Sequence, residues 1–128
     1  MAGTNWAGNI AYRAAHLHSP TTIEELQSIV AGSRRIRPLG TRHSFNRVAD
    51  TDGDQVSVAR LPQLLEVDAE ERTVTIAAGM RYGELAVPLH DRGWALANLG
   101  SLPHISVAGA VATGTHGSGE RNGSLATA

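Results

Sequence analysis

The stretch of sequence that decides the fold is Arg37-Pro38-Leu39-Gly40-Thr41-Arg42-His43-Ser44-Phe45-Asn46. It places a glycine-centred turn, a histidine and three small polar side chains directly after a short run of β type, Arg35 to Leu39. Such a loop offers backbone N–H groups to a phosphate and an imidazole to a bound cofactor. His43 alone is weak support, because a histidine in a loop more often serves as a hydrogen-bonding turn residue.

A second region of similar character, Leu99 to Gly119, is rich in glycine and carries no Asp, Glu, Lys or Arg. We expect Ser106 to start a short helix, Val107 to Thr113, whose exposed N–H groups favour an anion. A helix packed closely in a core explains the same pattern equally well, so both interpretations stay open. The residues that would leave the helix thin enough for a flat ligand are Gly109, Ala110 and Ala112, and those that would donate hydrogen bonds at its far end are Thr113, Gly114, Thr115 and Gly117.

Length and composition fit one globular domain at most, with 128 residues of which 41% are hydrophobic and 18% charged. A net charge of −1 and an aromatic content of 4% provide neither the field nor the stacking surface that nucleic acid needs. Cysteine is absent, which removes disulfides and thiolate metal sites. No signal peptide and no membrane-spanning helix is expected, so we predict a cytoplasmic protein that binds neither nucleic acid nor membrane.

Periodicity predicts an α+β fold with a mixed sheet flanked by helices, rather than the regular β-α-β alternation of a Rossmann domain. A capping-box pattern over Thr22–Glu25 predicts a helix with one apolar face that ends before a C-terminal Gly32. Asn5 to Tyr12 is expected to be extended. The other expected elements are strands over Arg35–Leu39 and Gln55–Leu61, a hairpin of Leu64–Asp68 and Arg72–Ala78, and a helix over Tyr82–Arg92 with Pro88 inside it.

Two further motifs have ordinary interpretations. Gly114-Thr115-His116-Gly117-Ser118-Gly119 follows a predicted helix rather than a strand, so it is not expected to be a dinucleotide-binding fingerprint. His16 and His18 have no third ligand at a sensible spacing and no nearby carboxylate in the sequence, so we expect them on the surface rather than on a metal. His104, like His116, lies in the glycine-rich region, where a ligand contact and a structural role both stay open.

Three motifs in register resemble the vanillyl-alcohol-oxidase-type (PCMH-type) FAD-binding domain: Arg37–Asn46, Ala78–Leu85 and Asn98–Gly109. The opening Asn5–Asn9 and the run Ala112–Gly119 point the same way. Within that family the chain is most similar to the bacterial alditol (xylitol/sorbitol) oxidases. The resemblance implies that residues 1–128 are an incomplete FAD-binding domain, with the rest of that domain and a substrate domain absent.

The resemblance also implies which residues bind the cofactor. The loop of Gly40, Thr41, Arg42, His43 and Ser44 would embrace the FAD pyrophosphate, and His43 matches the histidine that bonds covalently to the flavin 8α-methyl. Ser101 matches a serine near the flavin and the substrate hydroxyl, and it is the catalytic candidate. Many relatives have small residues at Thr41 and Arg42, so Arg42 either adds a phosphate contact or changes how tightly the loop wraps. The second wall of the site would consist of Ser106, Val107, Gly109, Ala110, Thr113, Gly114 and Gly117, with no metal.

The activity that the resemblance implies is oxidation of a terminal polyol hydroxyl to an aldehyde, with hydride passing to the flavin and O2 reduced to H2O2. An aldonolactone oxidase of the same superfamily is the alternative enzyme. A third interpretation is a non-catalytic fragment that binds flavin weakly or a partner chain, since an uncovered sheet edge favours association. We expect no turnover from residues 1–128 alone.

Overall fold

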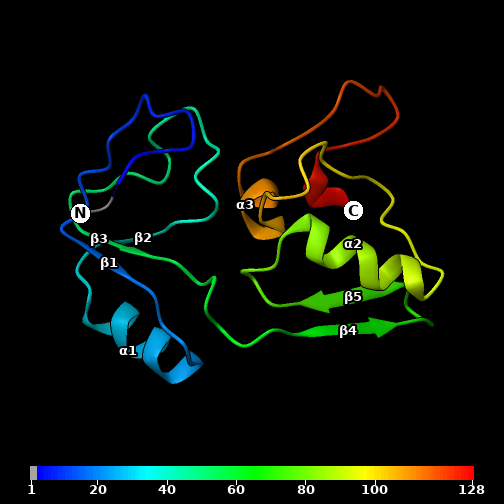
Figure 1. Ribbon diagram of the computed structural model, residues 1–128, viewed down its shortest axis with the longest axis horizontal. Coiled ribbons are helices and arrows are strands. Elements are labelled where there is room, and N and C mark those ends of the chain that lie inside the picture. The colour runs from blue at the N-terminus through cyan, green and yellow to red at the C-terminus, as the bar shows by residue number, and fades with distance from the viewer. Residues whose placement is uncertain (1–2) are drawn as a thin grey trace. The chain divides into compact units, whose positions relative to one another are not determined.

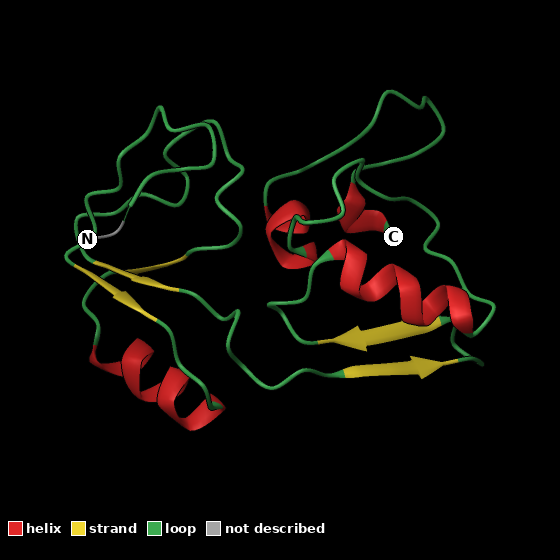
Figure 2. Cartoon of the chain, viewed as in Figure 1, coloured by secondary structure: helices red, strands yellow, loops and turns green. Residues whose placement is uncertain are grey.

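The computed structural model describes residues 3–128 and divides the chain into two compact units, Met1–Pro62 and Gln63–Ala128 (Figures 1 and 2). Parallel and antiparallel pairing both occur, as expected of an α+β fold, and they are divided between two sheets. The strands are β1 (His16–His18), β2 (Ile36–Pro38), β3 (Asp54–Val56), β4 (Leu65–Asp68) and β5 (Thr73–Ile76). The helices are α1 (Ile23–Gly32), α2 (Tyr82–Asp91), α3 (Val107–Ala112) and the 3₁₀ turn η1 (Leu125–Thr127).

The first unit is built on a three-stranded parallel sheet in the order β1-β3-β2. Gln55 at the centre of β3 is fully buried, and its Nε2 donates to the carbonyl of Ala49 at 2.6 Å. The strand expected over Gln55–Leu61 ends at Val56, because the chain turns where the N–H of Leu61 donates to the carbonyl of Val58 at 3.2 Å. A small core of Ile10, Tyr12 and Leu39 completes this unit.

The N-terminal segment turns back on itself, so the extended conformation expected over Asn5 to Tyr12 is wrong. Thr4 and Ala11 pair in an isolated antiparallel bridge. The buried Asn5 closes the turn, because its Oδ1 accepts from the N–H of Ile10 at 3.1 Å and its own N–H donates to the carbonyl of Ile10 at 3.0 Å. An asparagine side chain that bonds the backbone nearby favours a turn over a strand.

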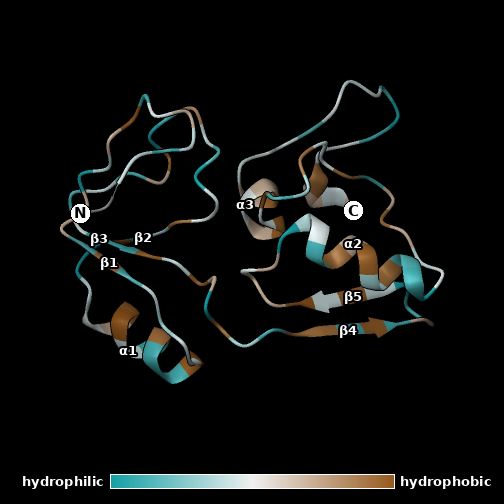
Figure 3. Cartoon of the chain, in the orientation of Figure 1, coloured by the Kyte–Doolittle hydropathy of each residue, from teal (hydrophilic) through white to brown (hydrophobic). Residues whose placement is uncertain are grey.

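Helix α1 begins at the predicted cap, where Thr22 Oγ1 accepts from the N–H of Glu25 at 3.1 Å. The Glu25 carboxylate reaches one residue further back than a capping box predicts and accepts from the N–H of Thr21 at 2.7 Å. Gly32 is the last helical residue, and the cap is Ser33. The predicted apolar face exists, as Figure 3 shows, but no side chain of α1, all of which the structure describes, is buried.

The second unit follows the sequence prediction closely. In the hairpin, Leu65 pairs with Ile76 and Val67 with Val74, and all four side chains pack against α2 and the residues around it. Helix α2 lies along the hairpin (Figure 2) and buries Leu85, which is 1% exposed. Pro88 lies inside α2, which ends just before Gly93 at a φ of +78°. Within residues 3–128, no helix has the length and apolar character needed to cross a membrane.

Candidate functional site

The loop that carries His43 leaves the parallel sheet at a buried anchor. Leu39 is 3% exposed, and its N–H donates to the carbonyl of Val56 at 2.8 Å. Beyond this point the chain is irregular, and Thr41 to Ser44 are half-buried. The residue in the left-handed conformation is Arg42, at a φ of +68°, and not Gly40, the expected centre of the turn. An arginine in this uncommon conformation shows that its surroundings hold the loop in place.

Those surroundings are the N-terminal turn. The N–H of Trp6 donates to the carbonyl of Arg42 at 2.7 Å, and Asn5 Nδ2 donates to the carbonyl of Ser44 at 3.1 Å. The Arg42 guanidinium points back to the same segment, with Nη1 3.5 Å from the carbonyl of Thr4. These contacts join residues about forty positions apart in the sequence, which is why the sequence pattern showed no link between the two segments.

The imidazole of His43 is held on two sides. Its Nδ1 lies 3.1 Å from Thr41 Oγ1, with the donor set by the tautomer. The indole of Trp6 stacks on its face, with ring centroids 5.4 Å apart and an angle of 20° between the planes. Both contacts restrict rotation of the ring, so the imidazole is oriented within the first unit by residues of that unit.

The second group of predicted site residues surrounds α3 in the second unit. Ser106 is the N-cap of α3 and is 5% exposed. The N–H of Val107 donates to the carbonyl of Met80 at 3.0 Å, so this N–H, expected to be exposed, is already engaged. Ala110 is 3% exposed in a core cluster with Tyr82 and Leu125. These residues are therefore structural parts of the predicted second wall, and they contribute little to the surface that a ligand would contact.

Gly109 is small for a local steric reason. A Cβ added there would lie 2.7 Å from Ser106 Oγ. The carbonyl of Gly109 also accepts a hydrogen bond from Thr113 Oγ1 at 3.0 Å. The hydroxyl of Thr113 is thus directed to its own helix, whereas the sequence predicted a donor to a ligand.

The exposed part of the second group lies beyond the end of α3. Gly114 adopts a φ of +65°, and a Cβ on Gly114 or Gly117 would meet no atom within 4 Å. His116 is exposed with Nδ1 3.0 Å from the carbonyl of Gly117. Ser101 and His104 are also exposed. Open glycine backbone of this kind is compatible with the close approach of a flat ligand with phosphates.

His16 and His18 lie on β1 beside Asp54 of β3, so the expectation of no nearby carboxylate is wrong. His16 Nδ1 is 3.0 Å and His18 Nε2 3.8 Å from Asp54 Oδ1. Parallel pairing places His16 directly opposite Asp54, which their distance in the sequence concealed. His16 is exposed as expected. Among residues 3–128, no three side chains of the types that bind metals gather at one point.

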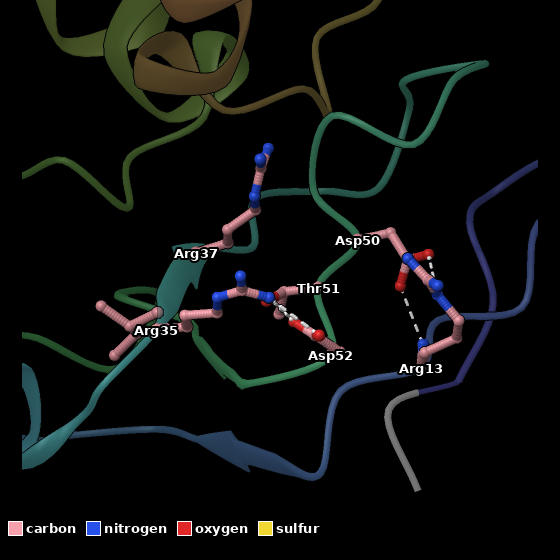
Figure 4. Close-up of a pocket in the computed structure, with 7 residues that line it drawn as sticks. Arg13, Arg35, Arg37, Asp50, Thr51 and Asp52 are labelled. Atoms are coloured by element: carbon pink, nitrogen blue, oxygen red, sulfur yellow. Dashed lines mark hydrogen bonds and ion pairs between the residues drawn. The ribbon is translucent and has the colours of Figure 1, made fainter.

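Sequence analysis missed an arginine-rich depression of about 500 Å³ in the first unit (Figure 4). Asp50, with a side chain 0% exposed, accepts from the N–H of Arg13 at 2.8 Å, from Arg13 Nε at 2.9 Å and from Arg47 at 2.7 Å. Arg35 binds both oxygens of Asp52, and Arg37 points away from both carboxylates. The lining residues are Arg13, Arg35, Ile36, Arg37, Asp50, Thr51 and Asp52.

The Asp50 cluster predicts a loss of stability in acid. The N–H of Arg13, followed by the Arg47 and Arg13 side chains, lowers the pKa of Asp50 from 3.8 to about 2 against the opposing effect of burial. Because the folded state has the lower pKa, the stabilisation is complete above about pH 4 and is lost as the pH falls through about 2. Urea unfolding between pH 5 and about pH 2 measures it. Asp50→Asn should flatten that pH dependence, and an unchanged slope would contradict the assignment.

Comparison with known proteins identifies the class of this domain. Residues 14–127 match the family described as FAD binding domain, and the chain belongs to this family. The chain is 53% identical over 128 residues to an alditol oxidase of a Streptomyces species, covering 98% of this chain and 31% of that protein. It is 33% identical to L-gulonolactone oxidase of Bos taurus, covering 96% of this chain and 29% of that protein. The chain thus spans less than a third of these relatives.

Solved structures show the same fold. Cholesterol oxidase from Brevibacterium sterolicum superimposes with a TM-score of 0.71 at 21% identity, over 89% of this chain and 23% of that one. The family match and this likeness confirm the resemblance to the vanillyl-alcohol-oxidase-type FAD-binding domain. The two groups of predicted site residues belong to different units of the chain, Gly40–Ser44 to the first and Ser101–Gly117 to the second.

Proposed function

We propose that this chain supplies the N-terminal FAD-binding part of a longer oxidase that converts the terminal hydroxyl of a polyol to an aldehyde, with O2 reduced to H2O2. The observation that carries the proposal is the 53% identity to an alditol oxidase over almost the whole chain, against 33% and 39% identity to two lactone oxidases. FAD when bound supplies the hydride-accepting and O2-reducing chemistry. This chain then supplies the binding and the orientation of the FAD. We also predict a cytoplasmic location, which cell fractionation would test.

In this proposal the loop Gly40–Ser44 holds the FAD pyrophosphate by its backbone N–H groups. His43 bonds covalently to the flavin 8α-methyl, a role supported by an imidazole already oriented by Thr41 and Trp6. Arg42 contributes through the shape of the loop, since its guanidinium is directed to Thr4.

The second wall divides into residues that support it and residues that contact the cofactor. Ser106, Val107 and Ala110 are engaged in caps, backbone hydrogen bonds and the core, so they hold the wall in shape. Gly109 keeps α3 narrow because it has no side chain, and the Thr113 hydroxyl donates to the carbonyl of Gly109 at the C-terminal end of the helix. Gly114 and Gly117 present open backbone and are the proposed contacts to FAD.

The proposal is tested on the full-length protein that contains these residues. Intact mass and a visible spectrum should show one FAD that acid precipitation does not release, and xylitol or sorbitol should give H2O2 faster than a γ-lactone does. Faster turnover of the γ-lactone would favour the aldonolactone oxidase, and a colourless protein would contradict the flavin assignment. Residues 1–128 alone should give no H2O2.

A partner-binding fragment is the second candidate, and one observation favours it. β1 and β2 are the outer strands of the three-stranded sheet and have one partner strand each in it. Such edges can pair with another chain. Polyol-dependent H2O2 production by residues 1–128 alone would exclude this candidate.

Ser101→Ala tests the catalytic candidate. The exposed hydroxyl of Ser101 is available to bind the substrate hydroxyl, so its removal should lower kcat/KM for the polyol about tenfold, the value of one hydrogen bond of about 1.4 kcal/mol. The FAD content should not change. Steady-state kinetics with xylitol measure the effect, and Ser118→Ala, which changes another exposed serine, is the control. An unchanged kcat/KM would remove Ser101 from the site.

A further inference from the structure

Among the described residues, the aromatic ring that contacts the indole of Trp6 is the imidazole of His43. The Trp6 residue is 64% exposed, so its indole adds little to the core. Its plane lies 20° from that of the His43 imidazole at a centroid separation of 5.4 Å, which is an offset stack. The indole therefore covers one face of the residue that the proposed function joins to the flavin.

The backbone of the loop is held without the indole. The main-chain N–H of Trp6 binds the carbonyl of Arg42, and the amide of Asn5 binds the carbonyl of Ser44. Neither hydrogen bond uses the indole ring, so both survive a substitution of Trp6. A change of this side chain consequently acts on the imidazole of His43 and leaves the path of the loop in place.

We propose that Trp6 is a positioning residue for covalent attachment of the flavin at His43, an inference that rests on the proposed function. The indole restrains the tilt of the imidazole plane, and Thr41 Oγ1, 3.1 Å from Nδ1, restrains the rotation of the ring within that plane. A reacting group that is held in its productive orientation reacts faster, because little of its freedom remains to be lost.

The atoms and electrons of the covalent attachment of the flavin to His43 balance as follows. The imidazole loses one proton and forms a C–N bond through a ring nitrogen to the 8α carbon, which loses one hydrogen. The two electrons and two protons released reduce the isoalloxazine. O2, the oxidant of the proposed activity, then reoxidises it and leaves as H2O2. Trp6 takes no part in the bond changes and affects only the orientation of the imidazole.

The test follows acid-stable FAD incorporation over time after FAD is added to full-length apoprotein. Trp6→Leu should slow incorporation about fivefold, which corresponds to the roughly 1 kcal/mol of an aromatic stack. Trp6→Phe keeps a ring over the imidazole and should stay within about twofold of the wild type. Phe45→Leu removes a different exposed aromatic side chain, 73% exposed and two residues after His43, and should leave the rate unchanged. Incorporation of FAD by the Trp6→Leu protein at the wild-type rate would overturn the proposal. So would a rate in the Trp6→Phe protein as slow as that of the Trp6→Leu protein.

A second measurement needs no cofactor. In apoprotein with ¹³C-labelled histidine, the ring resonances of His43 should move when Trp6→Leu removes the ring current of the indole, and they should not move in Phe45→Leu. Unmoved His43 resonances in Trp6→Leu would also overturn the proposal. Absence of covalent FAD in the wild type would instead reject the proposed attachment at His43, so the two failures are distinguishable.

Discussion

Replacing His43 with alanine should abolish acid-stable attachment of FAD to the full-length protein while FAD still binds non-covalently. The imidazole nitrogen forms the proposed bond, and alanine has no group that can replace it. The loop itself should persist, because the hydrogen bonds from Trp6 to Arg42 and from Asn5 to Ser44 do not involve the His43 side chain. The expected result is therefore complete loss of the covalent bond with a folded protein.

Intact mass and acid precipitation measure this directly. Wild-type protein should carry the mass of one FAD, and the His43→Ala protein should release all its flavin into the acid supernatant. His90→Ala changes an exposed histidine of α2, outside the proposed site, and should keep the flavin attached. If acid fails to release the flavin from the His43→Ala protein, another residue forms the link.

The parts of the fold that sequence predicted correctly are those with a local physical cause. The Thr22 cap of α1 depends on residues within one helical turn, and the β4-β5 hairpin depends on alternation over a few residues. Strand β1 was not predicted, because its three residues, His16–His18, are too few for an alternating pattern to be recognised, and they form a strand through pairing with β3. Such pairing is a property of the folded chain that local patterns do not contain.

The same distinction applies to the candidate site. The motifs led to the candidate loop at Gly40–Ser44 and the candidate glycine-rich segment after Ser106, because glycine and small polar residues are typical of backbone that a ligand approaches closely. The contacts that support the loop could not be predicted from the sequence. Trp6 and His43 stack on each other although they lie 37 positions apart, and neither motif contains a pattern that indicates contact with the other. The Asp50 cluster was missed for the same reason.

Gly53→Ala should be among the most damaging single substitutions in the first unit. A Cβ at Gly53 would lie 2.5 Å from the carbonyl oxygen and 2.7 Å from the Cβ of Arg35. That carbonyl accepts from the N–H of Asp54 at 2.9 Å, and the carbonyl of Gly53 accepts from Ala15 at 2.9 Å. The backbone must therefore move at the end of the sheet where β1, β2 and β3 begin. We expect this movement to lower the free energy of unfolding by about 3 kcal/mol. Because β2 leads into the His43 loop, affinity for FAD should fall as well.

Gly32→Ala is the matched control, and sequence alone does not distinguish the two glycines. Gly32 is the last residue of α1, and a Cβ there would meet no atom within 4 Å. Alanine should therefore be accepted, with a gain of about 0.5 kcal/mol from higher helix propensity. The urea midpoint of the Gly32→Ala protein should match or exceed that of the wild type, with unchanged FAD affinity. Equal urea midpoints for the two variants would show that the sheet around Gly53 can open without cost, and that the loop is held by its N-terminal turn alone.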